Sequence, residues 1–165
     1  MKTPICESCA KSGELCAACG GLLQEGRISE LDVTVSRLLA RLSAEHGLGD
    51  ADFFRAIDLG KVVLVLTRGD PGLLIGREGK VVAEISAAVG KKVRIAEAGG
   101  DMRKTVSDII FPARVSGVNA VYREGREEFK VRIPRGESHH LPMDAESLAR
   151  ALKAVFGSEV AVELE

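Results

Sequence analysis

Long apolar runs are missing from this sequence of 165 residues. No stretch of about 18 or more consecutive apolar residues occurs, so no transmembrane helix is expected. The N-terminus also lacks the charged start and apolar core of a secretory signal, and we expect a cytoplasmic protein with no membrane partner. Hydrophobic residues make up 45% and charged residues 28%, which is typical of a folded globular protein. The length suits one ordinary domain or two to three small modules.

Sequence motifs of the common enzyme classes are missing as well. The chain has no G-x-S-x-G nucleophile elbow, no Walker loop and no H-E-x-x-H pair. The adjacent His139 and His140 have no cysteine or paired carboxylate near them in sequence, and on a strand they would point to opposite sides. A loop position or a phosphate contact is therefore favoured over a metal site. We expect a binding protein and not an enzyme.

A large net charge is missing too, because the formal total is only −1. The charges are nevertheless unevenly distributed. The segment from Lys61 to Lys104 contains nine basic and five acidic residues, a net charge of +4, which leaves −5 for the rest of the chain. The middle of the chain is therefore basic between acidic flanks, a pattern that matters more for an anionic partner than the total does.

All four cysteines lie within the first twenty residues, as the pairs Cys6-x-x-Cys9 and Cys16-x-x-Cys19. Two short loops that each present two thiolates are typical of a tetrahedral Zn²⁺ site. Four cysteines would fill the coordination sphere of one ion, so the site is expected to be structural and not catalytic. Disulfides and an iron–sulfur cluster are the alternatives.

Residues 1–27 are expected to form a small zinc-knuckle or ribbon module around this ion. Gly20 and Gly21 follow the second pair directly and favour the tight turn of a zinc knuckle, in which backbone amides point at the sulfurs. A segment of this size cannot bury enough apolar surface to fold unaided, so the metal would supply the folding energy.

Residues 28–99 are expected to form one α+β unit. A capping-box-like Ser29-x-x-Asp32 begins a helix with one apolar face, and Gly47 ends it. The run from Val62 to Leu66 is continuously apolar, which suggests a strand covered on both faces. The expected order is helix, strand, strand, helix, helix, strand, with strands at Asp52–Leu59, Lys61–Thr67 and Lys91–Ala96 and a short helix opened by Pro71-Gly72.

The most specific motif of the chain is the tetrad Gly76-Arg77-Glu78-Gly79, which is followed by Lys80. It lies between the short helix and the longer amphipathic one that follows. The two glycines let the backbone turn sharply and leave no side chain in the way of an approaching phosphate.

Residues 100–165 are expected to repeat this succession with one element missing. The tetrad has no counterpart here, because His140-Leu141-Pro142-Met143-Asp144-Ala145 stands in its place. A hairpin turn is expected around Glu124-Gly125-Arg126. The elements are expected at Met102–Ile110 and Met143–Phe156 as helices, and at Val115–Arg123, Glu128–Ile133 and Val160–Leu164 as strands.

The element order and the tetrad resemble the type II KH domain, whose G-x-x-G loop clamps about four nucleotides of single-stranded RNA. The whole chain from about Ser29 to Glu165 resembles the tandem KH pair of the NusA family, especially its short archaeal members, with a degenerate second unit. That resemblance implies an α+β fold and a role in transcription elongation or termination. The four-cysteine module in place of a polymerase-binding domain, the missing second G-x-x-G and the missing S1-like barrel are departures from the family.

The resemblance also implies a site for single-stranded RNA in the first unit. Gly76, Arg77, Glu78 and Gly79 would form the phosphate loop, with Lys80 adding charge at the start of the next helix. The absence of tryptophan and the low aromatic content, 4%, argue against base–aromatic stacking as the main source of affinity. The groove for the bases would be formed by Ile75, Val82 and Ile85, with Val93 and Arg94 opposite.

Two alternative functions remain open from the sequence. A ribosome-associated or RNA-processing protein could use the same fold on structured RNA, and RNA polymerase and the ribosome are both candidate assemblies. The two C-x-x-C pairs could instead exchange electrons or hold an iron–sulfur centre. Thioredoxin-type chemistry would expect one pair at a strand–helix junction, which the glycine-flanked opening does not offer.

Overall fold

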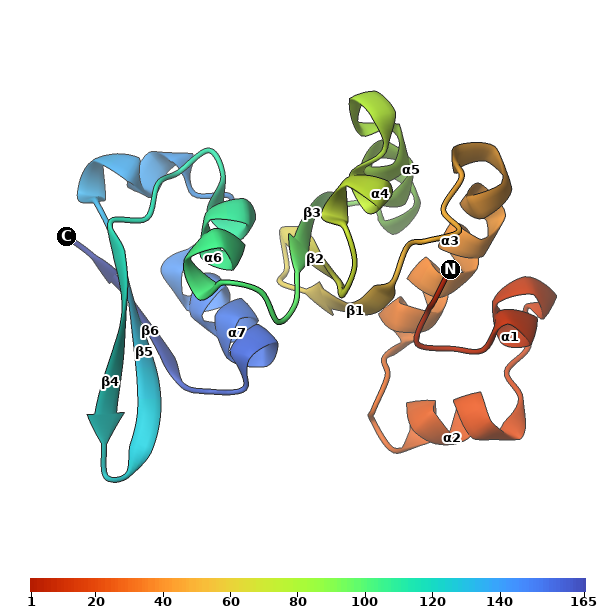
Figure 1. Ribbon diagram of the computed structural model, residues 1–165, viewed down its shortest axis with the longest axis horizontal. Coiled ribbons are helices and arrows are strands. Elements are labelled where there is room, and N and C mark those ends of the chain that lie inside the picture. Colours follow the sequence, from red (N-terminus) through yellow and green to blue (C-terminus); the bar gives the residue numbers. More distant parts are fainter. The chain divides into compact units, whose positions relative to one another are not determined.

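The computed structural model describes residues 1–165 and divides them into two compact units, Met1–Glu97 and Ala98–Glu165 (Figure 1). Each unit contains one three-stranded sheet together with helices, so the α+β class predicted from the sequence is confirmed. Residues 1–27 belong to the first unit. None of the helices has the length and apolar composition needed to cross a membrane.

The first unit contains five α-helices, one 3₁₀ helix and three strands. Its elements are α1 (Glu7–Ser12), α2 (Ala17–Gln24), α3 (Glu30–His46), β1 (Phe53–Asp58), β2 (Val62–Thr67), α4 (Pro71–Ile75), η1 (Arg77–Gly79), α5 (Lys80–Val89) and β3 (Lys92–Glu97). From α3 onward this is the predicted order, with η1 added at the tetrad.

Helix α3 begins with the predicted capping box. The Asp32 amide donates to Ser29 Oγ at 3.1 Å, and the Ser29 amide donates to Asp32 Oδ2 at 2.8 Å. The other carboxylate oxygen of Asp32 accepts a hydrogen bond from the Ala56 amide of β1 at 2.6 Å. Asp32 is only 1% exposed, so one buried carboxylate both caps the helix and fixes it to the sheet.

The first sheet has the strand order β1-β2-β3. Strand β1 is antiparallel to β2, and β2 is parallel to β3 across the connection made by α4 and α5. All six residues of β2 are buried, which confirms the prediction of a strand covered on both faces. Helices α3, α4 and α5 pack on one face, where their apolar side chains meet those of the strands; the cluster includes Leu39, Phe53, Val65, Leu74, Ile85 and Ile95.

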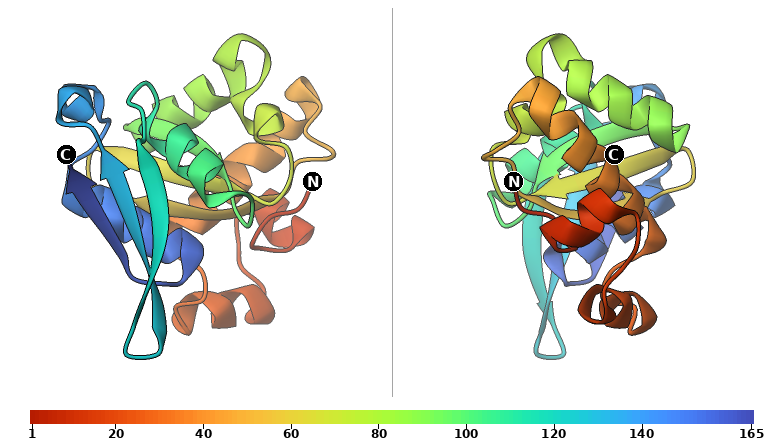
Figure 2. Two further views of the ribbon diagram at one scale, coloured as in Figure 1. Left: turned by 60° about the vertical axis from the view of Figure 1, so that its left-hand side comes forward. Right: turned by 90° about the vertical axis from the view of Figure 1, so that its right-hand side faces the viewer.

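The second unit repeats this sheet topology. Strand β4 is antiparallel to β5, and β5 is parallel to β6, in the order β4-β5-β6. The β4–β5 hairpin extends past the helices of its own unit (Figure 2), and its turn places Glu124 and Gly125 at φ of 50° and 75°. The elements are α6 (Met102–Ile110), β4 (Gly117–Arg123), β5 (Arg126–Ile133), η2 (Arg135–His140), α7 (Ala145–Phe156) and β6 (Val160–Leu164).

One expectation for this second unit is wrong. The element thought to be missing between β5 and α7 is present as the 3₁₀ helix η2. His139 and His140 end that helix and lie on no strand, and their ring centroids lie 3.9 Å apart. A short 3₁₀ helix of mixed polar residues carries no periodic signal, which is why the sequence did not reveal it.

Candidate functional site

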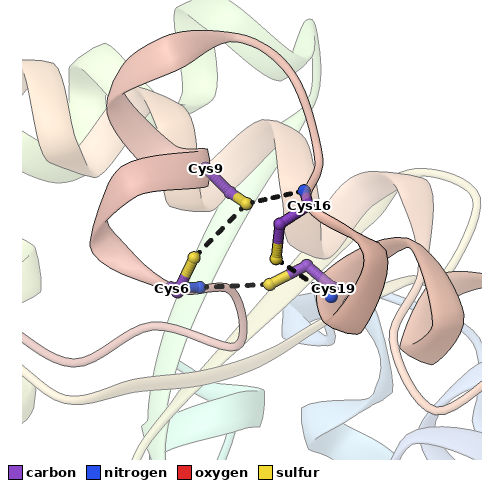
Figure 3. A group of neighbouring side chains, drawn as sticks. All are labelled: Cys6, Cys9, Cys16 and Cys19. Atoms are coloured by element: carbon purple, nitrogen blue, oxygen red, sulfur yellow. Dashed lines mark hydrogen bonds between the residues drawn. The ribbon is translucent and has the colours of Figure 1, made fainter.

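The four cysteines of the N-terminal segment converge on one point (Figure 3). Their sulfur atoms all lie within 4.8 Å of one another, close enough to share one metal ion. All four are free cysteines. Cys9 and Cys19 are buried, whereas Cys6 and Cys16 are exposed. The structure therefore brings together the complete predicted ligand set, Cys6, Cys9, Cys16 and Cys19.

Each C-x-x-C pair sits on the first turn of a helix. Cys6 is the N-cap of α1 and Cys16 is the N-cap of α2, so the second cysteine of each pair occupies the third helical position. Free backbone amides at a helix start favour negative charge. The Cys16 amide donates to Cys9 Sγ at 3.1 Å and the Cys6 amide donates to Cys19 Sγ at 3.4 Å. These bonds connect the two pairs to each other across the cluster.

Hydrogen bonding makes the two exposed thiols more acidic. The pKa of Cys16 is lowered to about 7, chiefly by the hydrogen bond from the Cys19 amide. The pKa of Cys6 is also lowered, chiefly by hydrogen bonding to the backbone at Cys9. The pKa of Cys9 is raised to about 12 and that of Cys19 is also raised, with burial and hydrogen bonds to neighbouring thiols among the causes. Thiolates are the metal-binding form of cysteine, so metal binding would have to displace protons from the two buried thiols.

The predicted role of Gly20 and Gly21 is wrong. Both glycines lie inside α2 and neither has a positive φ, so they do not form the tight turn of a knuckle. The amides that approach the sulfurs come from the helix starts instead. The signal was present in the sequence, because C-x-x-C spacing equals the spacing between an N-cap and the third helical residue.

The cysteine segment is packed against α3 and is joined to β1. Cys9, Cys19 and Val33 of α3 belong to one buried apolar cluster with Ile5 and Ala10. The Lys2 backbone also forms a parallel bridge to Asp52, with Lys2 donating to the Ala51 carbonyl and accepting from the Phe53 amide. The segment therefore shares apolar packing with the first unit and does not depend on its own side chains alone.

The Gly76–Gly79 loop is shaped by a close approach between Gly76 and Val81. Gly76 has a φ of 78°, and a Cβ atom placed on it would lie 2.5 Å from Val81 Cγ2. Gly79 has a φ of 72°, but a Cβ there would meet nothing nearer than Val82 Cγ1 at 3.8 Å. Only Gly76 is therefore excluded from carrying a side chain by contact as well as by conformation. The sequence motif did not indicate Val81, which is the residue that imposes this constraint.

The loop opens onto the start of α5, and no side chain caps that start. Gly79 is the N-cap of α5 and forms no side-chain hydrogen bond to it. The corresponding helix of the second unit, α7, is capped by Asp144, whose carboxylate accepts from the Ser147 amide at 2.7 Å. The Lys80 amide donates to the Arg77 carbonyl, but no side chain occupies the start of α5, whereas a carboxylate already occupies that of α7.

The predicted loop residues lie together on the surface. Ile75, Arg77, Glu78 and Lys80 are exposed, and neither Arg77 nor Lys80 forms an ion pair. Glu78 adopts a φ of 56°, uncommon for a residue other than glycine. The structure gathers these side chains around the uncapped helix start, with Val82 half-buried beside them.

Two predicted groove residues do not fit a direct role in binding. Ile85 is 0% exposed and belongs to the core, so it supports the surface from below and cannot touch a base. Arg94 lies between Val93 and Ile95, which both pack on the helix side of the sheet, so alternation places Arg94 on the other face. It is half-buried there, and burial lowers its pKa.

The Gly76 constraint gives a stability prediction. Replacing Gly76 with Ala should lower the free energy of unfolding by about 3 kcal/mol, because a strained φ and an overlap with Val81 combine. Gly79→Ala is the comparison variant and should lower it by only about 1 kcal/mol, since its ψ of 19° places it in the left-handed α region and the space is open, whereas Gly76 at a ψ of 171° lies in a region almost confined to glycine. Urea denaturation measures both. Equal losses would show that neither the backbone conformation of Gly76 nor its close approach to Val81 matters.

The cysteine cluster gives a metal-binding prediction. Titration with Co²⁺ should saturate at one equivalent, with the absorbance of a tetrahedral thiolate complex. The Cys6→Ala/Cys16→Ala variant should lose that spectrum, whereas Ser8→Ala between the first pair should keep it. Affinity should fall as the pH drops, because protons compete for the buried thiols at all pH values below about 12, and it should fall more steeply below about 7, where Cys16 is protonated as well. Binding of two ions, or binding unaffected by acid, would contradict this arrangement.

Comparison with known proteins gives a structural likeness only. No model of a known protein family matches the chain, and no curated protein matches it in sequence. Among solved structures, the chain is similar to the protein in "Crystal structure of APE1850", with a TM-score of 0.53 and 20% sequence identity. The match covers 76% of this chain and 96% of that one. At this level of identity the likeness concerns the fold alone.

Proposed function

We propose that this protein binds single-stranded RNA through the Gly76–Gly79 loop of a type II KH domain. The observation that carries the proposal is the loop itself. It combines a glycine backbone that passes close to Val81, a helix start without a side-chain cap and the exposed cations of Arg77 and Lys80. Such a surface suits a phosphodiester group, which needs amide donors and positive charge but little depth.

The fold of the first unit supports this proposal. The order helix, strand, strand, helix, helix, strand, with an antiparallel pair followed by a parallel pair, is the order expected of the type II arrangement. The loop lies between α4 and α5, as a KH phosphate loop would. The likeness to APE1850 supports the architecture and says nothing of the ligand.

The second unit is proposed to be a degenerate KH-like domain that braces or widens the surface. Its sheet repeats the topology of the first, but it has η2 where the first unit has α4 and the tetrad. Asp144 occupies the helix start that would otherwise receive a phosphate. Two units of this kind, of which only the first has a G-x-x-G loop, are the basis for proposing a NusA-like factor of transcription elongation or termination.

We further propose that the cysteine cluster holds one structural Zn²⁺ ion. Four thiolates in a compact cluster match the softness and tetrahedral preference of zinc, and they leave no open coordination position for a substrate. Cys6, Cys9, Cys16 and Cys19 would hold the ion, and the amides at the starts of α1 and α2 would offset part of the thiolate charge. Its contribution would be to fix α1 and α2 against α3.

Charge reversal in the loop tests the proposal. The Arg77→Asp/Lys80→Asp variant should bind a single-stranded RNA of about eight nucleotides at least tenfold more weakly, because four units of charge change next to the phosphate. Both side chains are exposed, so the fold should be preserved. Fluorescence anisotropy measures the affinity.

The control for this test is Arg123→Asp/Arg126→Asp, which changes the charge equally at the β4–β5 turn of the second unit. Its affinity should stay within about threefold of the unmodified protein at about 0.15 M salt, where distant exposed charges are screened. Unchanged affinity in the loop variant, or an equal loss in the control, would show that the loop is not the binding site.

A further inference from the structure

A basic cleft lies between the cysteine segment and α3, in the first unit. It has a volume of about 520 Å³. Helix α1 and the glycine that ends it form one wall, α3 forms the other, and Ala88 from the last turn of α5 completes it. Its lining consists of Ala10, Lys11, Gly13, Thr34, Arg37, Leu38, Arg41 and Ala88, a set with three cations and no carboxylate.

The two arginines of this cleft have no acidic partner. Neither Arg37 nor Arg41 forms an ion pair or a side-chain hydrogen bond to a carboxylate. The Nε atom of Arg37 is shielded from solvent and has no hydrogen-bond acceptor. A shielded guanidinium donor without an acceptor is uncommon, so the contacts that Arg37 makes within the protein leave its guanidinium group incompletely paired. Lys11 is paired with Glu7 at 2.6 Å, but that pair is exposed and therefore weak.

The spacing of the arginines suits a row of anions. Arg37 and Arg41 are four residues apart on α3, which places them on one side of the helix, roughly 6 Å apart along its axis. Arg41 is exposed and Arg37 is half-buried, and two guanidinium groups in such a line can each contact a separate phosphate. A single small anion would use only one of them.

The cleft and the Gly76–Gly79 loop lie at opposite ends of α5. The loop precedes Lys80, the first residue of the helix, and Ala88 lies in its last turn. The separation along the helix axis is about 12 Å, which a few nucleotides of extended chain can span. Glu84 lies between them on α5, where it faces His46 at 3.3 Å and so is directed toward the end of α3.

We propose that this cleft is a second contact for the RNA backbone, in which Arg37 and Arg41 bind phosphates a few nucleotides away from the loop. The inference rests on the proposed function, because the loop supplies the first contact. It also gives the cysteine segment a role: α1 carries Lys11 and is held in place by Cys9 and Ala10 in the buried cluster. An acidic peptide is the competing occupant, but Leu38 is the one large apolar residue that the cleft offers for recognising side chains, since Ala10, Gly13 and Ala88 are small.

RNA length separates the two contacts experimentally. An oligouridylate of about four nucleotides has no residue left over once the loop has clamped it, whereas one of about 16 nucleotides also reaches the cleft. The Arg37→Gln/Arg41→Gln variant should bind the long RNA about tenfold more weakly and the short RNA as tightly as the unmodified protein. For the long RNA, the slope of log affinity against log salt concentration should be shallower by an amount equivalent to about one to two phosphate contacts. The exposed single variant Arg41→Gln should show a smaller loss in the same direction, which guards against misfolding of the double variant.

The controls distinguish failure of this inference from failure of the proposed function. Arg123→Gln/Arg126→Gln removes the same charge from the second unit and should leave both affinities unchanged. The role of the cleft would be overturned if the arginine variant lost affinity for both RNA lengths or for neither, or if the control lost as much affinity. It would also be overturned if an octaglutamate peptide bound more tightly than RNA in a way that depends on the two arginines. Binding of the short RNA that survives Arg77→Asp/Lys80→Asp would instead overturn the loop as the primary site.

Discussion

The close approach of the Gly76 backbone to Val81 is the contact on which the candidate RNA surface depends. Val81 is 1% exposed and is anchored in the core with Leu74 and Ile85, so it cannot move aside. The chain entering from α4 must therefore pass it without a side chain. It then turns through Glu78 and Gly79, both at positive φ, before α5 begins. Val81, a buried core residue, thus fixes the backbone of Gly76 beside the start of α5.

The same helix start explains why two sheets of equal topology need not bind alike. In the first unit the N-cap is a glycine, and the amides of α5 have no side-chain partner. In the second unit Asp144 takes the N-cap position of α7 and accepts from Ser147. A capping carboxylate stabilises its helix and repels a phosphate at the same place. The two units therefore differ at one helix start, where Gly79 precedes α5 and Asp144 precedes α7.

Much of the fold could be predicted because its signals are local. The capping box at Ser29 and Asp32, the glycine after α3 and the continuous apolar run of β2 each depend on a few neighbouring residues. The convergence of the four cysteines followed from their spacing. The N-cap role of Cys6 and Cys16 was missed because glycines were assumed to supply the turn. Helical periodicity could not separate Ile85, which is buried, from Val82, because both lie on the apolar side of α5.

Long-range contacts explain the rest of what the sequence did not reveal. Arg37 and Arg41 of α3, which form no ion pair, line a cleft together with α1. Helix α1 lies about 25 residues earlier in the chain, and no local sequence pattern connects the two helices. The bond from Asp32 to the Ala56 amide likewise joins elements that only the folded chain brings together. The basic segment identified from composition begins at Lys61, so it did not include Arg37 or Arg41.

The central claim is that RNA meets the backbone of the Gly76–Gly79 loop at the start of α5. The most direct measurement is a ¹⁵N-resolved NMR titration with an oligouridylate of about five nucleotides. We expect the largest shifts at the amides of Gly76 through Val81, with the amides at the start of α7 unchanged. Shifts confined to the second unit, or none near Gly76 at saturating RNA, would contradict the account.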